Sequence, residues 1–353
     1  MAGMDEFALI RMLNRSRSTV VSDHPESGVS VGIGDDAAVL RPTGGKELVV
    51  SCDTMVESVH FKPETMTYED IGYKAMASSL SDIAAMGAEP RWALVALAAP
   101  RSSSPERLRE LYDGLYACAE RYGTSIVGGD TASSPSGLTV TVTVIGEAGA
   151  GGSLLRSAAK AGDAVFITGP LGGSAAGLRF LLERGGLAGP LEELPERIRP
   201  LARAHRLPEP RIDAGRLLAR AKPGMCGALN DISDGLASEA WEIAEASGVQ
   251  VTLYGDRIPV SDELRDYAAA SAHDPLDWAL YGGEDYELVG TVRQEYAAEL
   301  ASTFERAGKR IWFVGEVDSA VTGSADGKVG VTLVRAGADA GVPVGKRGYN
   351  HFA

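Results

Sequence analysis

The sequence predicts an α/β (α+β) fold made of two domains, and three observations support that prediction. Apolar stretches of strand length alternate with longer helical patterns along most of the chain. A chain of 353 residues is too long for one ordinary core and suits two domains of common size. The turn-forming run Gly146 to Gly152 separates the two halves. We therefore expect one domain over residues 1–148 and a second over residues 149–353.

The N-terminal half contains three predicted strands and two predicted helices. The strands are Glu47 to Cys52, Trp92 to Ala98 and Leu138 to Ile145, and the helices are Tyr68 to Met86 and Pro105 to Tyr122. Ser104 followed by Pro105 is typical of a helix N-cap with proline at the first helical position. Gly87 and Gly123 stand where helices commonly end, so both helices have marked boundaries.

The C-terminal half opens with a strand, a glycine-rich turn and a helix. Its predicted elements are the strand Asp163 to Thr168, the turn Gly169 to Ser174, the helix Leu236 to Ser247 capped by Gly248, and the strands Gln250 to Leu253 and Arg310 to Val314. The amides of the turn are candidates for holding a phosphate at a helix N-terminus, although tight strand-to-helix packing explains its glycines equally well. The proline-rich stretch Gly185 to Pro210 is expected to be a surface excursion.

Composition excludes several classes of function. A formal charge of -14 would repel a polyanion, so non-specific nucleic-acid binding is not expected. The three cysteines form no Cys-x-x-Cys pair, which argues against a zinc site and against a disulfide framework. No apolar run approaches the length of a membrane span, and the N-terminus lacks the pattern of an export signal. We expect a cytoplasmic protein with neither nucleic acid nor membrane as a partner.

Aspartates gather in five short segments flanked by glycine, serine or threonine. The segments are Gly32 to Ala37, Ser51 to Thr54, Ser79 to Asp82, Gly128 to Thr131 and Asn230 to Gly235. Asp36, Asp53 and Asp130 are expected at or just beyond strand ends, where α/β proteins commonly place ligands. Carboxylates and hydroxyls supply the oxygen ligands that Mg²⁺ prefers. Such residues also build turns and helix caps, but five segments together favour a magnesium site that binds phosphate.

Other catalytic patterns are weak in this chain. There is no P-loop motif, because Gly345-Lys346 is followed by Arg347, and there is no protein-kinase signature set. His24, His205 and His273 fall in predicted loops and are expected to be solvent-exposed. Cys52 is better explained as a buried cysteine at a strand end than as a nucleophile.

Six motifs in order along nearly the whole chain resemble those of the thiamine-monophosphate kinase family. They are Gly-Ile-Gly-Asp-Asp-Ala, Ser-Cys-Asp-Thr-Met-Val-Glu-Ser-Val-His-Phe, Ser-Leu-Ser-Asp-Ile-Ala-Ala-Met-Gly-Ala, Gly-Gly-Asp-Thr, Asp-Ile-Ser-Asp-Gly-Leu and Gly-Gly-Glu-Asp-Tyr-Glu-Leu. The family lies in the superfamily of aminoimidazole ribonucleotide synthetase. The resemblance implies the two-domain architecture of that superfamily, with mixed β-sheets flanked by helices, and a homodimer formed through the N-terminal domain.

The resemblance also implies roles for individual residues. Several Mg²⁺ ions around the ATP phosphates would be held by Asp36, Ser51, Asp53, Asp82, Asp130, Asp231 and Asp234, with Asp35 adjacent and Cys52 limited to its backbone carbonyl. Of these, Asp53, Asp130 and Asp231 would be catalytic. The nucleotide would contact Gly129, Arg156, Ser233 and Tyr112. Thiamine monophosphate would face His60, Glu284 and Tyr349, with its cationic thiazolium suited to the Glu284 carboxylate and to the Tyr349 ring.

The chemistry that follows is direct, in-line transfer of the ATP γ-phosphoryl group to thiamine monophosphate. A phosphate monoester is largely dianionic at neutral pH, so the acceptor needs no general base. Positioning and charge neutralisation would then carry catalysis, which accounts for a site rich in aspartate and poor in histidine. Two alternatives stay open: another ATP-dependent synthetase or dehydratase of the superfamily, and a non-catalytic protein that binds divalent ions.

Overall fold

The computed structural model describes residues 12–13, 27–33, 37–319, 329–338 and 340–346. Within these residues the chain forms a four-stranded sheet, a seven-stranded sheet and a small ribbon of β1 (Val29–Val31) and β2 (Val39–Leu40). Both larger sheets are mixed: β4 pairs with β5, and β9 with β12, in parallel, while the remaining neighbours are antiparallel. The predicted α/β class with mixed sheets flanked by helices is therefore confirmed.

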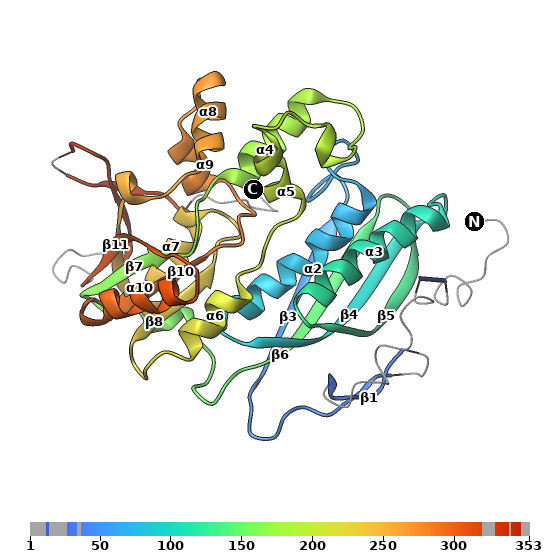
Figure 1. The fold of residues 1–353 in the computed structure, drawn as a ribbon, viewed down its shortest axis with the longest axis horizontal. Coiled ribbons are helices and arrows are strands. Elements are labelled where there is room, and N and C mark those ends of the chain that lie inside the picture. The colour runs from blue at the N-terminus through green and yellow to red at the C-terminus, as the bar shows by residue number, and fades with distance from the viewer. Residues whose placement is uncertain (1–11, 14–26, 34–36, 320–328, 339, 347–353) are drawn as a thin grey trace.

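The four-stranded sheet belongs to the N-terminal half and has the order β3-β6-β4-β5. Its strands are β3 (Leu48–Val56), β4 (Glu89–Pro100), β5 (Ser125–Ser134) and β6 (Thr139–Glu147). Helices α2 (Tyr68–Ala85) and α3 (Pro105–Arg121) lie side by side across one face of this sheet (Figure 1). As predicted, Ser104 caps α3, accepting a hydrogen bond from the Arg107 amide at 3.2 Å.

Helices α2 and α3 approach each other through two glycines. A Cβ atom on Gly72 would stand 1.8 Å from the Leu111 carbonyl oxygen, and one on Gly114 would stand 1.9 Å from the Glu69 carbonyl oxygen. Any side chain larger than hydrogen would therefore push the helix backbones apart. This contact fixes the position of α2, which is buried along most of its length.

The seven-stranded sheet belongs to the C-terminal half and has the order β13-β12-β9-β11-β7-β10-β8. Its strands are β7 (Asp163–Ile167), β8 (Cys226–Asp231), β9 (Val249–Tyr254), β10 (Leu288–Arg293), β11 (Trp312–Ser319), β12 (Gly330–Val334) and β13 (Val342–Val344). The accompanying helices are α4 (Gly173–Arg184), α5 (Arg199–Arg206), α6 (Ile212–Ala219), α7 (Leu236–Ser247), α8 (Asp262–Ala270), α9 (Pro275–Tyr281) and α10 (Ala297–Arg306). The sheet divides two apolar cores, because Phe166 of β7 packs in one and its neighbours Val165 and Ile167 pack in the other.

The first of these cores runs across both halves of the molecule. It joins α2 and α3 to residues of β7, β8, β10, α6 and α10. Helix α2 thus lies between the four-stranded sheet and strand β8 of the other half. This position matters for function, because α2 and β8 each carry one of the aspartate segments.

One predicted surface segment is built into the fold. The stretch Gly185 to Pro210 contains α5, whose His205 and Arg206 side chains are buried, so the expectation of a surface excursion is wrong for residues 201–210, whereas most of residues 185–200 are exposed or partly exposed. The Arg206 guanidinium donates from Nε to Asp70 Oδ2 at 2.7 Å. Asp70 also receives the Thr67 amide in the capping box at the start of α2, so this ion pair fixes α5 on α2.

Candidate functional site

Three aspartates meet where α2 lies against β3 and β8. Asp53 is in β3, Asp82 is in α2, and Asp231 is the last residue of β8. The expectation that Asp53 and Asp130 stand at strand ends is wrong, since β3 continues to Val56 and β5 continues to Ser134. What brings Asp53 to α2 is the alternation of β3, which turns Ser51 and Asp53 to the same face as the buried Val49 and Met55.

Hydroxyl groups surround these carboxylates. The Ser51 hydroxyl donates to Asp82 Oδ2, and the Ser81 hydroxyl donates to Asp231 Oδ2 at 2.7 Å. The Ser78 and Ser79 hydroxyls donate to the carbonyl oxygens of Ala75 at 3.1 Å and Val142 at 3.0 Å, and both serines lie beside Asp53 and lower its pKa. The serines of the Ser79 to Asp82 segment and its flank thus share one helix with Asp82, which is why the sequence places them so close together.

Burial dominates the electrostatics of the three carboxylates. Burial, with the charge of Asp82, raises the pKa of Asp53 to about 6. Burial, again with the charge of Asp82, raises the pKa of Asp231 to about 7, and its side chain is 3% exposed. The pKa of Asp82 is raised by burial and lowered by the Ser51 hydroxyl and the Arg156 charge. Three partly desolvated carboxylates that repel one another form a site suited to a cation.

The donor set fits Mg²⁺ when the substrate is counted among the ligands. Within the described residues, no three His, Cys, Asp or Glu side chains converge on a single point that would hold a metal by protein ligands alone. Mg²⁺ in phosphoryl-transfer sites is commonly bound by one or two carboxylates together with phosphate oxygens and water. Asp53, Asp82 and Asp231, with their serine neighbours, meet that requirement.

The loop after β8 is held by a network centred on Glu239. Asn230 donates from Nδ2 to Glu239 Oε2 at 2.5 Å, and the Asp234 amide donates to Oε1 at 3.1 Å. Ser233 donates its hydroxyl to the same oxygen at 3.4 Å. Burial, with the charge of Asp231, raises the pKa of Glu239 to about 8. Glu239 is not among the predicted site residues, although it lies on α7 directly after the Asn230 to Gly235 segment.

Arg156 faces the same region from the turn Arg156–Ala158. Its Nε donates to Asn230 Oδ1 at 2.8 Å, and its Nη1 pairs with Glu242 Oε2 at 2.8 Å. The side chain is half exposed, and its charge lowers the pKa of both Asp82 and Asp231. A guanidinium beside the carboxylates suits the binding of phosphate oxygens.

Strand β5 contributes the exposed pair Gly129 and Asp130. A Cβ atom on Gly129 would stand 1.8 Å from the Val95 carbonyl oxygen, so the strand requires glycine there. Tyr112 of α3 is buried beside this strand, hydrogen-bonded to Thr131, and burial raises the pKa of its hydroxyl to about 12. Gly129 therefore precedes Asp130 in β5, and Tyr112 packs against the same strand from α3.

The segment Gly282 to Leu288 follows α9, and each of its acidic side chains has a different partner. Asp285 accepts the Gly172 amide at 2.6 Å and the Ser174 amide at 3.3 Å. These are amides of the glycine-rich turn before α4, so a carboxylate of this chain occupies the place where a phosphate was one of the two expectations. The turn is explained by packing and capping instead.

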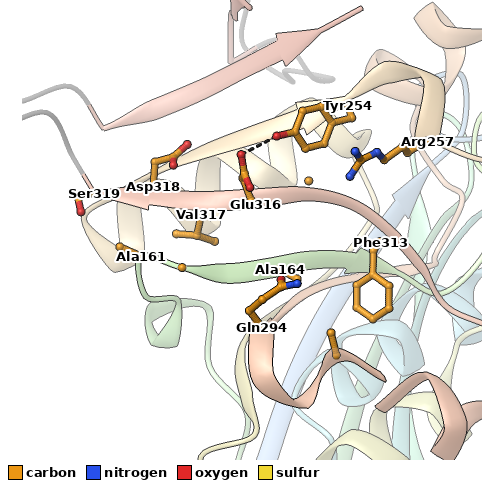
Figure 2. Close-up of a pocket in the computed structure, with 13 residues that line it drawn as sticks. Ala161, Ala164, Tyr254, Arg257, Gln294, Phe313, Glu316, Val317, Asp318 and Ser319 are labelled. Atoms are coloured by element: carbon orange, nitrogen blue, oxygen red, sulfur yellow. Dashed lines mark hydrogen bonds between the residues drawn. The ribbon is translucent and has the colours of Figure 1, made fainter. Parts of the chain in front are cut away.

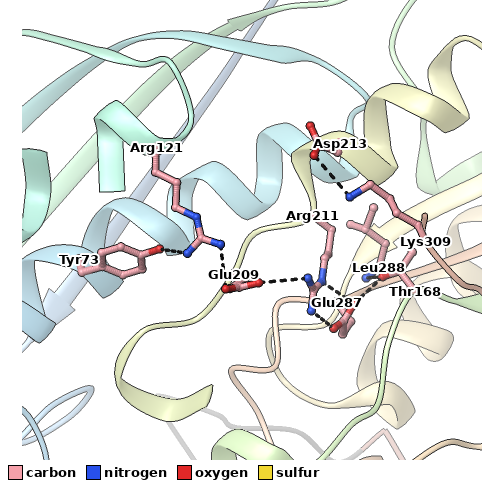
Figure 3. Close-up of polar contacts among 9 residues, drawn as sticks. All are labelled: Tyr73, Arg121, Thr168, Glu209, Arg211, Asp213, Glu287, Leu288 and Lys309. Carbon is pink, nitrogen blue, oxygen red and sulfur yellow. Dashed lines mark hydrogen bonds and ion pairs between the residues drawn. The ribbon is translucent and has the colours of Figure 1, made fainter. Parts of the chain in front are cut away.

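Glu287 anchors the end of the same segment (Figure 3). It accepts from Arg211 Nε at 2.8 Å and from the Thr168 hydroxyl at 2.7 Å. Arg211 also pairs with Glu209, which pairs in turn with Arg121 of α3. This chain of charges links the two halves of the molecule and fixes the segment to both.

Glu284 is the third acidic residue of the segment, and it meets a buried lysine. Lys74 Nζ of α2 lies 2.6 Å from Glu284 Oε2, and His205 Nδ1 of α5 lies 3.3 Å from the same oxygen. The expectation that His205 is solvent-exposed is therefore wrong. Lys74 was missed, although a lysine within the apolar run Ile71 to Ala77 was a visible signal.

The remaining predicted residues are spread around these groups. His60 lies in the turn after β3, where its Nδ1 accepts the Val56 amide at 3.0 Å. Cys52 is exposed on the outer face of β3, so the expectation of a buried cysteine is wrong, and the Thr143 hydroxyl donates to its Sγ at 3.2 Å. His273 is exposed, as expected. Asp35, Asp36, Tyr349 and His24 lie outside the described residues.

Two hollows of the surface lie away from the aspartates. One, of about 510 Å³, is on the seven-stranded sheet, where the Tyr254 hydroxyl donates to Glu316 at 2.5 Å and Arg257 covers the Tyr254 ring (Figure 2). The other, of about 420 Å³, is lined by Arg121, Glu209 and Arg211. Neither contains a predicted site residue. Among the described residues, no helix is long and apolar enough to cross a membrane.

Comparison with known proteins gives a consistent result. The family descriptions that match are "AIR synthase related protein, N-terminal domain" over residues 34–148 and "AIR synthase related protein, C-terminal domain" over residues 160–328. The chain is 45% identical to the thiamine-monophosphate kinase of Bacillus subtilis (strain 168) over 83% of this chain and 85% of that protein.

Two solved structures are similar over nearly the whole chain. The thiamine-monophosphate kinase of Stenotrophomonas maltophilia K279a has a TM-score of 0.78 at 34% identity, covering 94% of this chain and 96% of that one. A structure described as AaThiL complexed with AMPPCP and TMP has a TM-score of 0.73 at 28% identity, covering 100% of this chain and 98% of that one.

Proposed function

The chain belongs to the thiamine-monophosphate kinase family, and we propose from this premise that its site transfers the γ-phosphoryl group of ATP to thiamine monophosphate, giving thiamine diphosphate and ADP. The observation that carries the proposal is the group of buried carboxylates Asp53, Asp82 and Asp231 where the two halves of the molecule meet. It stands in a chain related to a protein solved with an ATP analogue and TMP.

Several Mg²⁺ ions complete this site in our proposal. The candidate ligands are Asp36, Ser51, the Cys52 carbonyl, Asp53, Asp82, Asp130, Asp231 and Asp234. When bound, Mg²⁺ neutralises the charge that develops on the transferred phosphoryl group. The carboxylates of the chain orient the ions, and Arg156 adds a fixed positive charge beside Asp82 and Asp231. Asp53, Asp130 and Asp231 are the residues proposed to act most directly in the transfer.

The two substrates bind on either side of the carboxylates in this proposal. Gly129, Tyr112, Arg156 and Ser233 contact the nucleotide, and His60, Glu284 and Tyr349 contact thiamine monophosphate. The acceptor arrives as a dianion and needs no base to deprotonate it. The hydrogen bond from the Glu284 amide to the Ser233 carbonyl oxygen, 2.6 Å long, supports a shared site, because it joins the two sets of residues.

We also propose a homodimer formed through the four-stranded sheet. Alternate side chains of β3 turn Leu48 and Val50 outward on the face opposite α2, and these are 50% and 62% exposed. Leu94 of β4, which is separated from β3 by β6 in the sheet, is exposed as well. Exposed apolar side chains on one face of a sheet favour a second copy of the chain as their partner. Residues 1–148 are then the nucleotide-binding and dimerisation domain, and residues 149–353 are the second domain.

The function is tested by a panel of acceptors. Purified protein is incubated with ATP and Mg²⁺ together with thiamine, thiamine monophosphate or aminoimidazole precursors, and the products are separated by chromatography. We expect thiamine monophosphate alone to turn over, with one ADP formed per thiamine diphosphate. Turnover of an acceptor without thiamine, and none of thiamine monophosphate, overturns the proposal.

A further inference from the structure

Lys74 is a buried lysine that pairs with Glu284, one of the residues proposed to contact thiamine monophosphate. Its side chain is 0% exposed, yet it projects from α2 of the N-terminal half to Glu284 of the C-terminal half at 2.6 Å. A buried ammonium is costly unless it is paired, so the pair is maintained only while both elements keep their places. His205 adds a second contact, with Nδ1 3.4 Å from Lys74 Nζ.

Glu284 is held in an unusual conformation beside this lysine. Its φ is +67°, in the left-handed region that few non-glycine residues adopt, and its amide donates to the Ser233 carbonyl oxygen at 2.6 Å. Such conformations persist where the surroundings enforce them, and they concentrate at functional sites. Here the enforcing contacts are the Ser233 hydrogen bond on the backbone and the Lys74 ion pair on the side chain.

The two carboxylate oxygens of Glu284 differ in their surroundings. Oε2 is in contact with both Lys74 and His205. Among the described residues, no hydrogen bond or ion pair is formed by Oε1, and the side chain is 27% exposed. Glu284 therefore presents one oriented oxygen outward, while the positive charge of Lys74 cancels the negative charge of the carboxylate.

Helix α2 connects this pair to the metal-binding aspartates. Lys74, Ser78 and Asp82 are spaced four residues apart and so lie on one face of the helix. Ser78 lies beside Asp53, and Asp82 stands in the carboxylate group. The helix rise separates Lys74 from Asp82 by about 12 Å. One rigid, buried element thus sets the spacing between Glu284 and the aspartates.

We propose that Lys74 is a positioning residue for thiamine monophosphate: it holds Glu284 so that Oε1 accepts a hydrogen bond from an N–H group of the substrate, as part of a neutral pair. This inference rests on the proposed function and replaces the expectation that Glu284 is a counter-ion for the thiazolium. A Lys74–Glu284 pair has no net charge with which to attract a cation. The aminopyrimidine of thiamine supplies N–H donors of the required kind.

The experiment measures KM for thiamine monophosphate, KM for ATP and kcat in three variants. They are Lys74→Met, Glu284→Gln and the double variant, with Lys222→Met as the matched control at an exposed ion pair. In Lys74→Met we expect KM for thiamine monophosphate to rise by about tenfold or more, and KM for ATP to change by less than about threefold. The control keeps both KM values of the wild type.

The double variant distinguishes an oriented acceptor from a counter-ion. It replaces the buried ion pair by a neutral pair and keeps an acceptor oxygen, so we expect its KM for thiamine monophosphate to be lower than that of either single variant. An unchanged KM for thiamine monophosphate in Lys74→Met overturns the inference. So does a double variant whose KM rises by the product of the factors measured for the two single variants. Lys74→Gln, which keeps a hydrogen-bond donor, replaces Lys74→Met if the latter does not fold.

Wild-type turnover separates this inference from the proposed function. Wild-type protein that phosphorylates thiamine monophosphate, together with an unaffected Lys74→Met variant, removes the role of Lys74 and leaves the kinase assignment standing. Wild-type protein without that activity removes both.

Discussion

Asp231 has a pKa well above the ordinary value of an aspartate. It is buried, and the charges of Asp82 and Asp53 add to the cost of ionising it, so that its pKa rises to about 7 from an ordinary value of 3.8. The Ser81 hydrogen bond and the Arg156 charge act in the opposite direction and lower the pKa of Asp231. The ionised residue is therefore unfavourable for the stability of the metal-free protein, and binding of a cation at the proposed site would offset that cost.

Replacing Asp231 by Asn should reduce activity and raise stability. Turnover should fall by at least about 100-fold, because a charge that we propose orients the metal and the phosphates is lost. Between pH 4 and pH 7 the folded protein keeps a proton on Asp231 that the unfolded chain has released, so this group costs stability progressively as pH rises. In Mg²⁺-free buffer at pH 8, Tm of the variant should exceed that of the wild type by about 2 °C or more.

Thermal denaturation at several pH values, with EDTA, provides the measurement. The difference in Tm between Asp231→Asn and wild type should grow from pH 4 to pH 7, and adding Mg²⁺ with ATP should stabilise the wild type more than the variant. A difference that is independent of pH, or a variant that is less stable at pH 8, would contradict this explanation of the carboxylates.

At this scale, the sequence was informative where partners are near in the chain and uninformative where they are distant. The aspartate segments were visible because each aspartate has serine or glycine beside it. Lys74 and His205 are 131 positions apart, and nothing local to either indicates the contact. The prediction that His205 is solvent-exposed was wrong for the same reason, since the burial of His205 depends on how α5 packs on α2. Cys52 was misplaced because a strand with one uncovered face exposes alternate residues.

Among the elements, helix α2 organises the site. Its first turn is fixed by the capping box of Thr67 and Asp70 and by Arg206 of α5, and the turn that follows is fixed by the approach of α3 at Gly72. Because one face of α2 carries Lys74, Ser78 and Asp82, a rotation or shift of the helix moves the groups that we propose for metal binding and for substrate binding together.

The close approach of α2 and α3 should make Gly72 intolerant of substitution. Gly72→Ala places a methyl group against the Leu111 carbonyl and should destabilise the protein by about 1–3 kcal/mol or more. The position of Asp82 should shift with the helix, so kcat should fall as well. Urea denaturation measures the first effect and steady-state kinetics the second.

Gly149→Ala is the matched control, because a Cβ atom there meets nothing within 4 Å. It should leave both stability and kcat close to wild type. Equal stability of Gly72→Ala and Gly149→Ala would show that the helices do not pack as described.

Helices were predicted from sequence more accurately than strands. The caps at Ser104, Gly87 and Gly123 placed α2 and α3 to within a residue at each end. The predicted strand ends at Cys52, whereas β3 continues to Val56. The reason is that Asp53 and Thr54 are residue types common in turns, although here they pair with β6. Helix α5 was missed because prolines around it obscure a short helix whose stability comes from packing.

In the whole molecule, the candidate site combines residues from both halves of the chain. The carboxylates come from β3, α2 and β8, and the Gly282 to Leu288 segment is bound to α2 through Glu284 and to the Arg121 and Glu209 charges through Arg211. No single half contains the complete arrangement. Activity should therefore require the intact chain.

The outer face of the four-stranded sheet leads to a prediction about assembly. Val50→Asp places a charge in the centre of the exposed apolar face of β3 and should convert a dimer into a monomer. Val342→Asp, at an exposed valine of the edge strand β13, is the matched control and should remain dimeric. Sedimentation velocity measures both. A wild-type protein that sediments as a monomer, or a dimeric Val50→Asp, would exclude this face as the interface.

The central claim is direct transfer of the γ-phosphoryl group to thiamine monophosphate, and isotope tracing tests it most directly. ATP labelled in the γ-phosphate is mixed with the protein, Mg²⁺ and thiamine monophosphate, and the label is followed through the products. The structure and its family predict that the label is found in the terminal phosphate of thiamine diphosphate, in a one-to-one ratio with ADP. Label released as inorganic phosphate, with the acceptor left unphosphorylated, would contradict the account.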